Sequence, residues 1–379
     1  MANNNKHTGP NVPALRFPEF SGEWEQCQIK DFGKVITGST PPTSKTEYYD
    51  NGEFLWASPA DLGNVKDVVS TKTKLSQQGF NKCRKIPAHS ILVTCIGSTI
   101  GKMGMATTEM ATNQQINSII PIDCSPDYVY YSIQSRFPKY ITSIATQAVP
   151  ILSKSVFESL DSYKTSIEEQ NKIGKLLHLL DERIDAQSKI IEEQETLLKS
   201  LADRLFSQNN HSCQLSKLVD IVKGKQLNAD TLSEVGDYYV MNGGITPSGY
   251  YSEYNVPAGA ISISEGGNSC GYVQFNEKPF WSGGHCYSLQ CRTNLVDYKY
   301  IYYYLKTKEA DVMALRIGSG LPNIQKKDIE KFTISYPSLQ SQKQFVKALD
   351  ALSEKINTEK HLLEKYCQQK SYLLSQMFI

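Results

Sequence analysis

The chain contains one long helical stretch twice, and this repeat limits its possible folds more than any other feature. "SIEEQNKIGKLLHLLDERI" occupies residues 166–184, and "SLQSQKQFVKALDALSEKI" occupies 338–356, 172 positions later. The same spacing relates "VYYSIQSRF" from Val129 to "IYYYLKTKE" from Ile301. Near the start of each copy the spacing is 186, so the second copy is 14 residues shorter in its middle. A repeat this long is no solenoid unit, and it predicts two tandem domains, each followed by a helix.

Bulk composition narrows the class of protein. At about 150 residues per domain, the 379 residues suggest two or three domains. No apolar run approaches the ~18 residues of a membrane span, and the N-terminus has no apolar signal segment, so we expect no membrane association. The nine cysteines form no CxxC pair, which predicts reduced thiols in a cytoplasmic protein. The net charge of +1 gives no bulk electrostatic argument for binding nucleic acid.

Each repeated stretch predicts a helix with heptad spacing. Ser166 and Glu169 fit a capping box at the start of the first helix. Apolar residues then alternate in steps of four and three over several turns, which predicts a coiled coil. The alternative is two unrelated surface helices, each packed on its own domain. The polar residues that interrupt the seams and would penalise wrong registers are Gln187, Gln194, Glu359 and Lys370. The predicted seam residues are Ile173, Leu177, Leu180, Ile184, Ile191, Leu198, Leu201, Leu205, Phe345, Leu349, Leu352, Ile356, Leu363, Leu373 and Met377.

The two helices set the expected architecture. About 40 residues of helix extend about 60 Å at ~1.5 Å per residue. The first helix carries the chain from the first domain to the second. The second helix leaves the second domain and is expected to run back towards the first. We therefore expect an antiparallel coiled coil with a domain at each end, related by pseudo-two-fold symmetry. Two similar domains at a fixed distance suit two separated half-sites on duplex DNA. The expected segments are an N-terminal tail (1–22), a first domain (23–165), a central helix (166–209), a second domain (210–337) and a C-terminal helix (338–379).

The sequence of each domain predicts a mixed α/β fold with many short strands. "AHSILVTCIGSTIGKMGMA" (88–106) predicts a buried strand, a glycine turn and another strand, and "AGAISISEGGNSCGYV" (258–273) predicts the same. "NSIIPI" and "CYSLQC" are predicted as further strands. "DYVYYSIQSRF" and "DYKYIYYYLKTK" are predicted as helices whose tyrosines face the core.

The loops differ between the two copies, whereas the framework is kept. "GSTPPTSKTEYY" (38–49) offers basic, hydroxyl and aromatic groups, and its counterpart from Gly224 begins "GKQLNADT". Lysine, hydroxyl and amide side chains contact base edges and phosphates, so different loops on one framework predict two readers of different DNA sequences. The alternative is that any single one of these loops is ordinary protein surface and contacts no DNA. The predicted DNA contacts are Thr43, Ser44, Lys45, Tyr48, Ser98, Thr99, Lys102, Asn113, Gln114, Gln115, Lys154, Lys225, Asn242, Asn268, Ser269, His285, Asn323 and Lys326.

The sequence contains no recognisable catalytic or metal-binding motif. "GSTIGKM" has three residues between its glycines and Met103 after the lysine, whereas a P-loop needs four residues and then Ser or Thr. "GSGLPN" lacks the third glycine of a dinucleotide-binding fingerprint. No HExxH, GxSxG, paired metal ligands or Asn-Pro-Pro-aromatic methyltransferase motif occurs. We therefore predict that the chain is not an enzyme by itself and holds neither a metal nor a cofactor.

Together these features resemble the DNA specificity subunit of type I restriction-modification systems. The resemblance covers nearly the whole chain, and the ordered, duplicated set of motifs is what makes it specific. The second half lacks the Pro-Pro loop and the Gly-Lys hairpin, so DNA-contacting loops are harder to transfer there. The motifs are "PALRFPEFSGEW" (13–24), "GSTPP" (38–42), "ILVTCIGSTIGKMGMA" (91–106), "NQQINSIIP" (113–121), "VPILSKSVFESL" (149–160) and "SIEEQNKIGKLLHLLDERID" (166–185), and the second half repeats "GLPNIQKKDIEKF" and "SLQSQKQFVKALDALSEKIN".

The resemblance implies a role and partners. Each domain would be a target-recognition domain that reads one half of a bipartite, asymmetric site on double-stranded DNA. The helices would fix the gap and dock two modification (methyltransferase) subunits, which carry S-adenosylmethionine and flip the target adenine. Restriction subunits would add the nuclease, with its ATP and Mg. Phosphate contacts from the modification subunits would explain the near-zero net charge of this chain.

Apolar residues beside the heptad seam predict where such partners dock. We expect some of Ile190, Leu197, Leu362 and Leu374 to contact partner subunits, and the alternative is a wide intramolecular seam. A second interpretation of the whole chain is a two-headed coiled-coil scaffold for protein or glycan partners, with no role on DNA. It fits the repeat equally well, but it does not explain the loop and terminal motifs.

Overall fold

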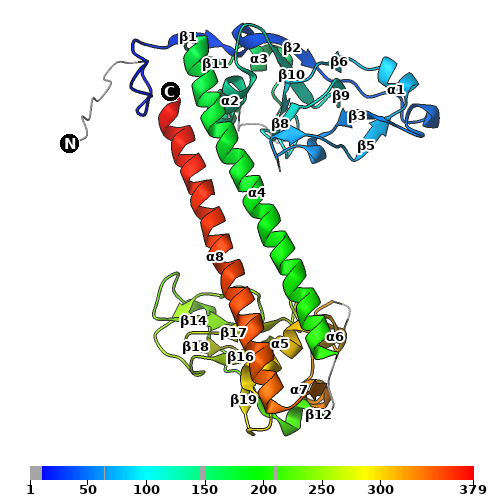
Figure 1. Cartoon of the computed structure of the whole chain (residues 1–379), viewed down its shortest axis with the longest axis vertical. Helices are drawn as coiled ribbons and strands as arrows, with labels where there is room; N and C mark the ends of the chain where they lie inside the picture. The colour runs from blue at the N-terminus through cyan, green and yellow to red at the C-terminus, as the bar shows by residue number, and fades with distance from the viewer. Residues whose placement is uncertain (1–10, 64, 145–150, 208–210, 319) are drawn as a thin grey trace. The chain divides into compact units, whose positions relative to one another are not determined.

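The chain folds into two compact units that share two long helices. The computed structural model describes residues 11–63, 65–144, 151–207, 211–318 and 320–379, and Figure 1 labels many of its elements. The first unit is the chain up to Lys189 together with His361–Ile379, and the second is Ile190–Lys360. Each unit therefore contains part of α4 (Ile167–Phe206) and part of α8 (Leu339–Met377).

The first unit is built on a five-stranded sheet in the order β2-β10-β7-β8-β4. It also has a four-stranded sheet, β5-β3-β9-β6, and a two-stranded ribbon, β1-β11. Helix α2 packs on the five-stranded sheet through the largest hydrophobic cluster of this unit. The element bounds are β1 Glu25–Gln28, β2 Gly33–Thr37, β3 Phe54–Ala57, β4 Asp67–Val68, β5 Thr73–Leu75, α1 Gln77–Asn81, β6 Lys85–Ile86, β7 Ile91–Thr94, β8 Met103–Ala106, β9 Met110–Thr112, β10 Ile116–Pro121, α2 Pro126–Ile144, α3 Lys154–Glu158 and β11 Asp161–Lys164.

The second unit has a four-stranded sheet in the order β13-β19-β16-β17. A three-stranded sheet, β15-β14-β18, and a ribbon, β12-β20, accompany it. The mixed α/β fold predicted from the sequence is thus confirmed in both units. The element bounds are β12 His211–Gln214, β13 Val219–Lys223, β14 Tyr238–Met241, β15 Tyr250–Tyr251, β16 Ala260–Ser264, β17 Val273–Asn276, β18 Phe280–Ser282, β19 Cys286–Cys291, α5 Tyr298–Thr307, α6 Glu309–Ala314, α7 Lys326–Lys331 and β20 Thr333–Tyr336.

Matching hydrogen bonds in the two units confirm the predicted duplication. Gln170 accepts a hydrogen bond at 3.0 Å from the backbone N–H that precedes α2. Gln342 accepts one at 2.8 Å from the backbone N–H that precedes α5. The hydroxyls of Tyr128 and Tyr300 each donate at 2.9 Å to a carbonyl of the ribbon in their own unit. The repeated residues therefore form the same contacts twice.

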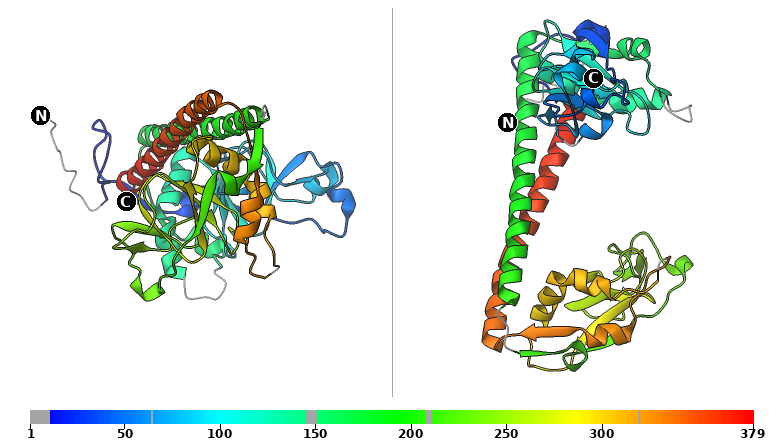
Figure 2. Two further views of the ribbon diagram at one scale, coloured as in Figure 1. Left: turned by 90° about the horizontal axis from the view of Figure 1, so that it is seen from below. Right: turned by 90° about the vertical axis from the view of Figure 1, so that its right-hand side faces the viewer.

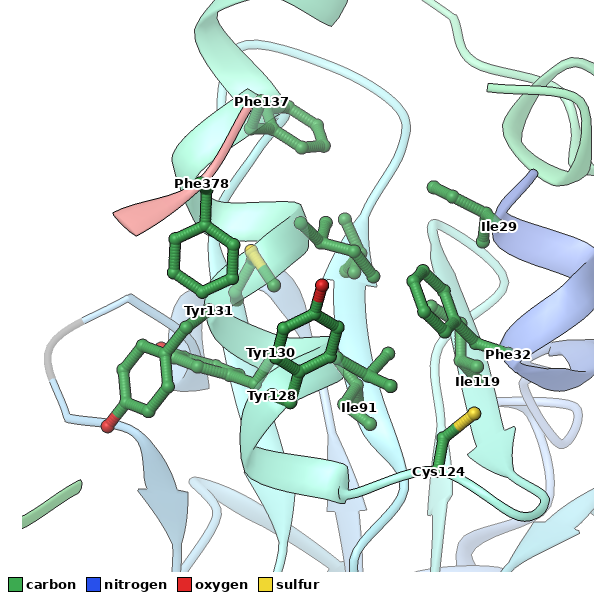
Figure 3. Packing of buried hydrophobic residues seen from close by; sticks show 14 of the residues in the cluster. Ile29, Phe32, Ile91, Ile119, Cys124, Tyr128, Tyr130, Tyr131, Phe137 and Phe378 are labelled. Carbon is green, nitrogen blue, oxygen red and sulfur yellow. The ribbon is translucent and has the colours of Figure 1, made fainter. Parts of the chain in front are cut away.

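Helix tyrosines lie in the core, as predicted. Tyr128, Tyr131 and Tyr300 are 0% exposed. In Figure 3 the ring of Tyr128 lies among Phe32 and Phe378, with ring centroids 6.3 and 5.6 Å away. Burial of aromatic rings is a large hydrophobic contribution, and edge-to-face contacts add to it.

In the first unit the two long helices pack antiparallel. Ile173 of α4 and Met377 of α8 belong to one hydrophobic cluster. Further along α4, the carboxylate of Asp181 pairs with Lys370 Nζ at 2.6 Å. Residues further along α4 therefore contact residues nearer the N-terminal end of α8, which makes the two helices antiparallel. Figure 2 shows the two helices alongside one another.

The second unit repeats this arrangement with the other halves of the same helices. Glu195 of α4 pairs with Lys360 of α8 at 2.6 Å, and Ala202 shares a hydrophobic cluster with Leu349. The antiparallel heptad seam is thus confirmed within each unit. Its buried members are Ile173, Leu177, Leu180, Ile191, Leu349, Ile356 and Met377, and its half-buried members are Ile184, Leu198, Leu201, Leu205, Phe345, Leu352, Leu363 and Leu373.

Residues 11–22, within the expected N-terminal tail, pack on the first unit. Leu15 N donates to Gln376 O at 2.8 Å. Arg16 donates to both carboxylate oxygens of Glu169, at 2.7 and 2.8 Å, and the side chains are 3% and 1% exposed. Ser166 caps α4 by accepting a hydrogen bond from Glu169 N at 3.3 Å, which is half of the predicted capping box. The Glu169 carboxylate accepts from Arg16 and Thr165 in place of the backbone N–H of Ser166. The Glu169 carboxylate thus holds the N-terminal segment onto the start of α4.

Candidate nucleic-acid interface

Strand register brings several loops of the first unit to one edge of its five-stranded sheet. Thr37 at the end of β2 pairs with Asn117 near the start of β10. Thr94 at the end of β7 pairs with Ile116, and β8 starts beside the end of β7. We call this end of the sheet the loop edge of the first unit. The loops that leave it are 38–53, 95–102 and 113–115.

Backbone hydrogen bonds join these loops. Cys95 N donates to Gln115 O at 2.8 Å, and Ser39 N donates to Thr112 O at 2.7 Å. Leu152 N donates to Cys95 O at 2.8 Å, which brings the start of α3 to the same edge. Six of the predicted contacts are gathered in this way: Ser98, Thr99, Asn113, Gln114, Gln115 and Lys154.

The Pro-Pro loop offers exposed polar groups beside a small pocket. Thr43, Ser44 and Lys45 are exposed, whereas Tyr48 is only 8% exposed and supports the loop from within. The ammonium group of Lys45 lies 5.4 Å from the centroid of the Tyr48 ring. A pocket of about 360 Å³ beside the loop is lined by Thr40, Thr43, Thr46, Tyr49 and Trp56, among others.

Lys102 lines a second, larger pocket of about 880 Å³ in the first unit. Lys66 and Lys370 line the same pocket, together with Asp181 and Asp185 of α4. Burial raises the pKa of the Asp185 carboxyl, and the neighbouring charge of Asp181 adds to the rise. Two of the three lysines are already paired, Lys66 with Asp127 and Lys370 with Asp181, each at 2.6 Å, so this pocket is less favourable for phosphate than the exposed loops are.

Arg84 is a basic residue at the loop edge that sequence reasoning missed. Its guanidinium donates to Gly38 O at 2.5 Å, and its backbone N donates to Ser39 Oγ at 2.9 Å. The side chain is exposed beside the Pro-Pro loop. The run "KCRK" at 82–85 was the available signal, because clustered basic residues on one surface are typical of phosphate binding.

The second unit has a loop edge with the same register. Lys223 at the end of β13 pairs with Tyr287, and Ser264 at the end of β16 pairs with Cys286 at the start of β19. β17 starts beside the end of β16. The loops that leave this edge are 224–237, 265–272 and 283–285.

Six of the predicted contacts in the second unit lie around this edge. Asn242 Oδ1 accepts a hydrogen bond from His285 N at 3.1 Å. Ser269 Oγ donates to Gly243 O at 2.6 Å, and Asn323 forms a β-bridge with Gly266. The gathered residues are Lys225, Asn242, Asn268, Ser269, His285 and Asn323. Lys326 lies at the start of α7, where it pairs with Glu330 at 3.7 Å.

Glu265, the residue directly after β16, was not among the predicted DNA contacts. Its side chain is 10% exposed, and its carboxylate accepts hydrogen bonds from Lys223 Nζ at 2.7 Å and Tyr287 OH at 2.8 Å. Burial and the hydrogen bond to Glu265 raise the pKa of Tyr287 well above its usual value. The tyrosine hydroxyl therefore remains a donor to the carboxylate.

Three of the four apolar residues predicted to dock partners are exposed. Ile190, Leu197 and Leu362 are 40%, 57% and 37% exposed. The expected exposure of the fourth was wrong: Leu374 is partly buried against the core of the first unit and lines the 880 Å³ pocket. In that pocket Leu374 lies with residues of α2 and α4, among them Phe137 and Ile184.

Within the described residues, no helix is long and apolar enough to cross a membrane. The same residues contain no group of three or more His, Cys, Asp or Glu side chains able to hold a metal ion.

Sequence comparison assigns both units to one family. The chain matches the type I restriction modification DNA specificity domain twice, over residues 21–196 and 209–365. The chain belongs to this family. The resemblance found in the sequence is thereby confirmed, and the family match gives no support to the scaffold alternative.

Two members of the DNA specificity family illustrate the similarity in sequence. The specificity subunit of the type I restriction enzyme MjaIX from Methanocaldococcus jannaschii is 30% identical over 191 residues, which are 48% of this chain and 43% of that relative. The chain thus spans less than half the length of this relative. The type I specificity subunit S.MgeORF438P of Mycoplasma genitalium is 22% identical over 303 residues, 75% of this chain and 79% of the relative.

A solved structure extends the likeness to the whole fold. The crystal structure of a type I restriction-modification S subunit from M. genitalium has a TM-score of 0.71 and 20% identity. It covers 97% of this chain and 99% of its own chain. The family fold with two DNA specificity domains therefore includes both units of this chain.

Proposed function

We propose that this chain is the DNA specificity subunit of a type I restriction-modification complex. Each unit reads one half of a bipartite, asymmetric site on double-stranded DNA. The observation that carries the proposal is that both units have the same strand framework but different side chains at the same edge. At equivalent positions the first unit has Cys95 and the second has Glu265. The backbone N–H of Cys95 donates at 2.8 Å to the loop before β10, and that of Glu265 donates at 2.9 Å to the loop before β19.

The side chains at the two loop edges have the chemistry that base reading needs. The exposed Ser98 of the first unit corresponds to Asn268 in the second. The exposed Gln114 corresponds to Gly284. Hydroxyls and amides both donate and accept, so they can discriminate base edges in the major groove. Different side chains on one framework favour two different half-sites, and hence an asymmetric site.

The chain's near-zero net charge fits a shared interface with the DNA. Phosphate contacts account for much of the affinity of most DNA-binding proteins. With a net charge of +1, this chain supplies few of them, and two modification subunits that close around the duplex supply the rest. S-adenosylmethionine belongs to those subunits, and ATP and Mg belong to restriction subunits that join them. The proposal also places the chain in the cytoplasm, with the host DNA.

The exposed apolar residues of α4 and α8 support docking of the modification subunits. Leu197 is 57% exposed, and Ile190, seven residues earlier on the same face of α4, is 40% exposed. Single exposed apolar residues are common, but two on one helix face of the second unit favour a contact surface. Replacing Leu197 with Asp should weaken co-purification with the modification subunit. The control is Ser200→Asp, which adds the same charge at an exposed position of the same helix. Equal recovery of the complex from both variants would contradict the docking proposal.

The proposed function is tested by methylome sequencing. A methylation-free host should express this chain together with the modification subunit of its own system. We expect one bipartite motif with methyladenine in each half and a gap of fixed length. Exchanging residues 23–160 for those of another family member should change one half only. A soluble, intact complex that methylates no adenine would overturn the proposal.

A further inference from the structure

The second unit has a buried carboxylate at its loop edge, where the first unit has a thiol. Glu265 is 8% exposed and follows β16, and Cys95 is 2% exposed and follows β7. The backbone N–H of Cys95 donates to Gln115 O at 2.8 Å, and that of Glu265 donates to His285 O at 2.9 Å. The two residues therefore occupy equivalent positions, and so do Gln115 and His285.

One oxygen of this carboxylate is well satisfied and the other is not. Oε1 of Glu265 accepts hydrogen bonds from Lys223 Nζ at 2.7 Å and Tyr287 OH at 2.8 Å. Oε2 is buried and has no hydrogen-bond partner among the described residues. His285 Nδ1 lies 3.6 Å from it. A buried carboxylate oxygen without a donor is costly, so a site that keeps one has a use for it.

His285 is held so that one ring nitrogen faces this oxygen and the other faces outward. Its backbone N–H donates to Asn242 Oδ1 at 3.1 Å, which fixes the start of the side chain. Gly243, at a positive φ of 87°, leaves room for it: a Cβ there would lie 3.1 Å from His285 Cβ. The side chain is 63% exposed. Since Nδ1 faces the carboxylate and the side chain is largely exposed, Nε2, one carbon further round the ring, is the nitrogen left for a ligand at the loop edge.

In a neutral imidazole, the single ring proton is best placed on Nδ1, which faces Oε2. The negative charge of Glu265 is already balanced by the ammonium group of Lys223 at 2.7 Å. Tyr287 remains a neutral donor, because burial raises its pKa. A proton on Nδ1 can approach Oε2, which leaves a lone pair on the exposed Nε2.

We propose that His285, positioned by Glu265, accepts a hydrogen bond from the exocyclic amino group of a base in the half-site of the second unit. That base is adenine, through N6, or cytosine, through N4, because these carry the amino donors of the major groove. Glu265 is a positioning residue: it fixes the orientation and tautomer of the ring without touching DNA. The first unit has Gln115 and Cys95 instead, so the arrangement serves one half-site only. The inference rests on the proposed DNA-reading function.

Base analogues test the proposal directly. The full chain, in complex with its modification subunits, is titrated with duplexes that contain the site found by methylome sequencing. In each duplex one adenine is replaced by purine, or one cytosine by 2-pyrimidinone, which removes a single amino group. At one position of the second unit's half-site, the unmodified protein should bind about tenfold more weakly.

Two variants show whether His285 and Glu265 act together. His285→Phe keeps a ring without nitrogen, and Glu265→Gln keeps the shape but lets an amide N–H face Nδ1, which favours the other tautomer. Both variants should bind the natural duplex about tenfold more weakly than the unmodified protein does. Each should bind the natural duplex and the duplex with the analogue at that position with equal affinity. The double variant should be no weaker than His285→Phe alone, since residues that act through one contact are not additive.

The control is Glu253→Gln, a change at an exposed glutamate of the same unit, which should keep the full discrimination. If Glu265→Gln keeps the tenfold loss with the analogue, Glu265 does not position the reader. If removing an amino group weakens binding only in the half-site of the first unit, His285 does not make the contact. Either result overturns the inference while the DNA-reading function stands. If the unmodified protein binds no duplex specifically, the proposed function itself fails.

Discussion

The last residues of the chain complete the core of the first unit, and removing one ring should show this. Phe378 is 7% exposed, and its ring centroid lies 6.2 Å from that of Trp24 and 5.6 Å from that of Tyr128. Replacing it with alanine leaves a cavity beside both rings. In the second unit Phe206 occupies the same place, 172 positions earlier, with its ring centroid 5.2 Å from that of Tyr300.

The expected cost follows from burial and position. Phe→Ala substitutions in cores cost about 3–5 kcal/mol. Phe378 lies just beyond the end of α8, where the backbone can relax into the space, so we expect about 3 kcal/mol, at the lower end of that range. For a unit of about 200 residues this lowers the unfolding midpoint by roughly 6–12 °C. The aromatic contacts with Trp24 and Tyr128 contribute part of this value.

Hydrogen exchange locates the effect. Phe378→Ala should lower the protection of amides in α2, around Tyr128–Ile133, and leave those of α5, around Tyr300–Leu305, unchanged. Phe206→Ala is the matched control and should do the reverse. Phe378→Ala could lower amide protection in α5 as much as in α2, or could leave both helices unchanged. Either result would show that Phe378 does not belong to the core of the first unit.

Three further predictions concern single groups. Arg16→Ala strands the buried carboxylate of Glu169 and should cost about 3–5 kcal/mol in chemical denaturation; a change below about 1 kcal/mol would contradict the burial of this pair. Iodoacetamide at pH 8 should modify exposed Cys291 and spare Cys95, because burial raises the pKa of Cys95 to about 12, and mass spectrometry of the native protein checks this. The pKa of Asp185 is raised by burial, so the folded state binds its proton more tightly and stability falls as the pH rises through that raised pKa. Asp185→Asn should therefore be more stable than the natural protein at pH 7, with a difference that vanishes below the ordinary value of 3.8 in urea titrations at several pH values.

The framework of the candidate site could be predicted from the sequence, but its chemistry could not. Alternating apolar residues and glycine turns identify the strands around 88–106 and 258–273, and the loops between them follow. Whether a loop residue is exposed depends on what packs over it, which explains why Tyr48 is 8% exposed although its neighbours are open. The partners of Glu265 come from β13 and β19, and no local pattern links residues so far apart in the chain.

By itself the sequence determined the duplication, the mixed α/β units and the heptad seams, because these depend on periodicity and local propensity, which repeat visibly along the chain. It also carried the family motifs. Tertiary structure alone decided which part of each helix completes which core: Phe378 closes the first unit and Phe206 the second. It also decided that Leu374 is packed inward and that Arg16 meets Glu169, 153 positions away. Such contacts depend on side-chain packing between segments remote in sequence, which local patterns do not encode.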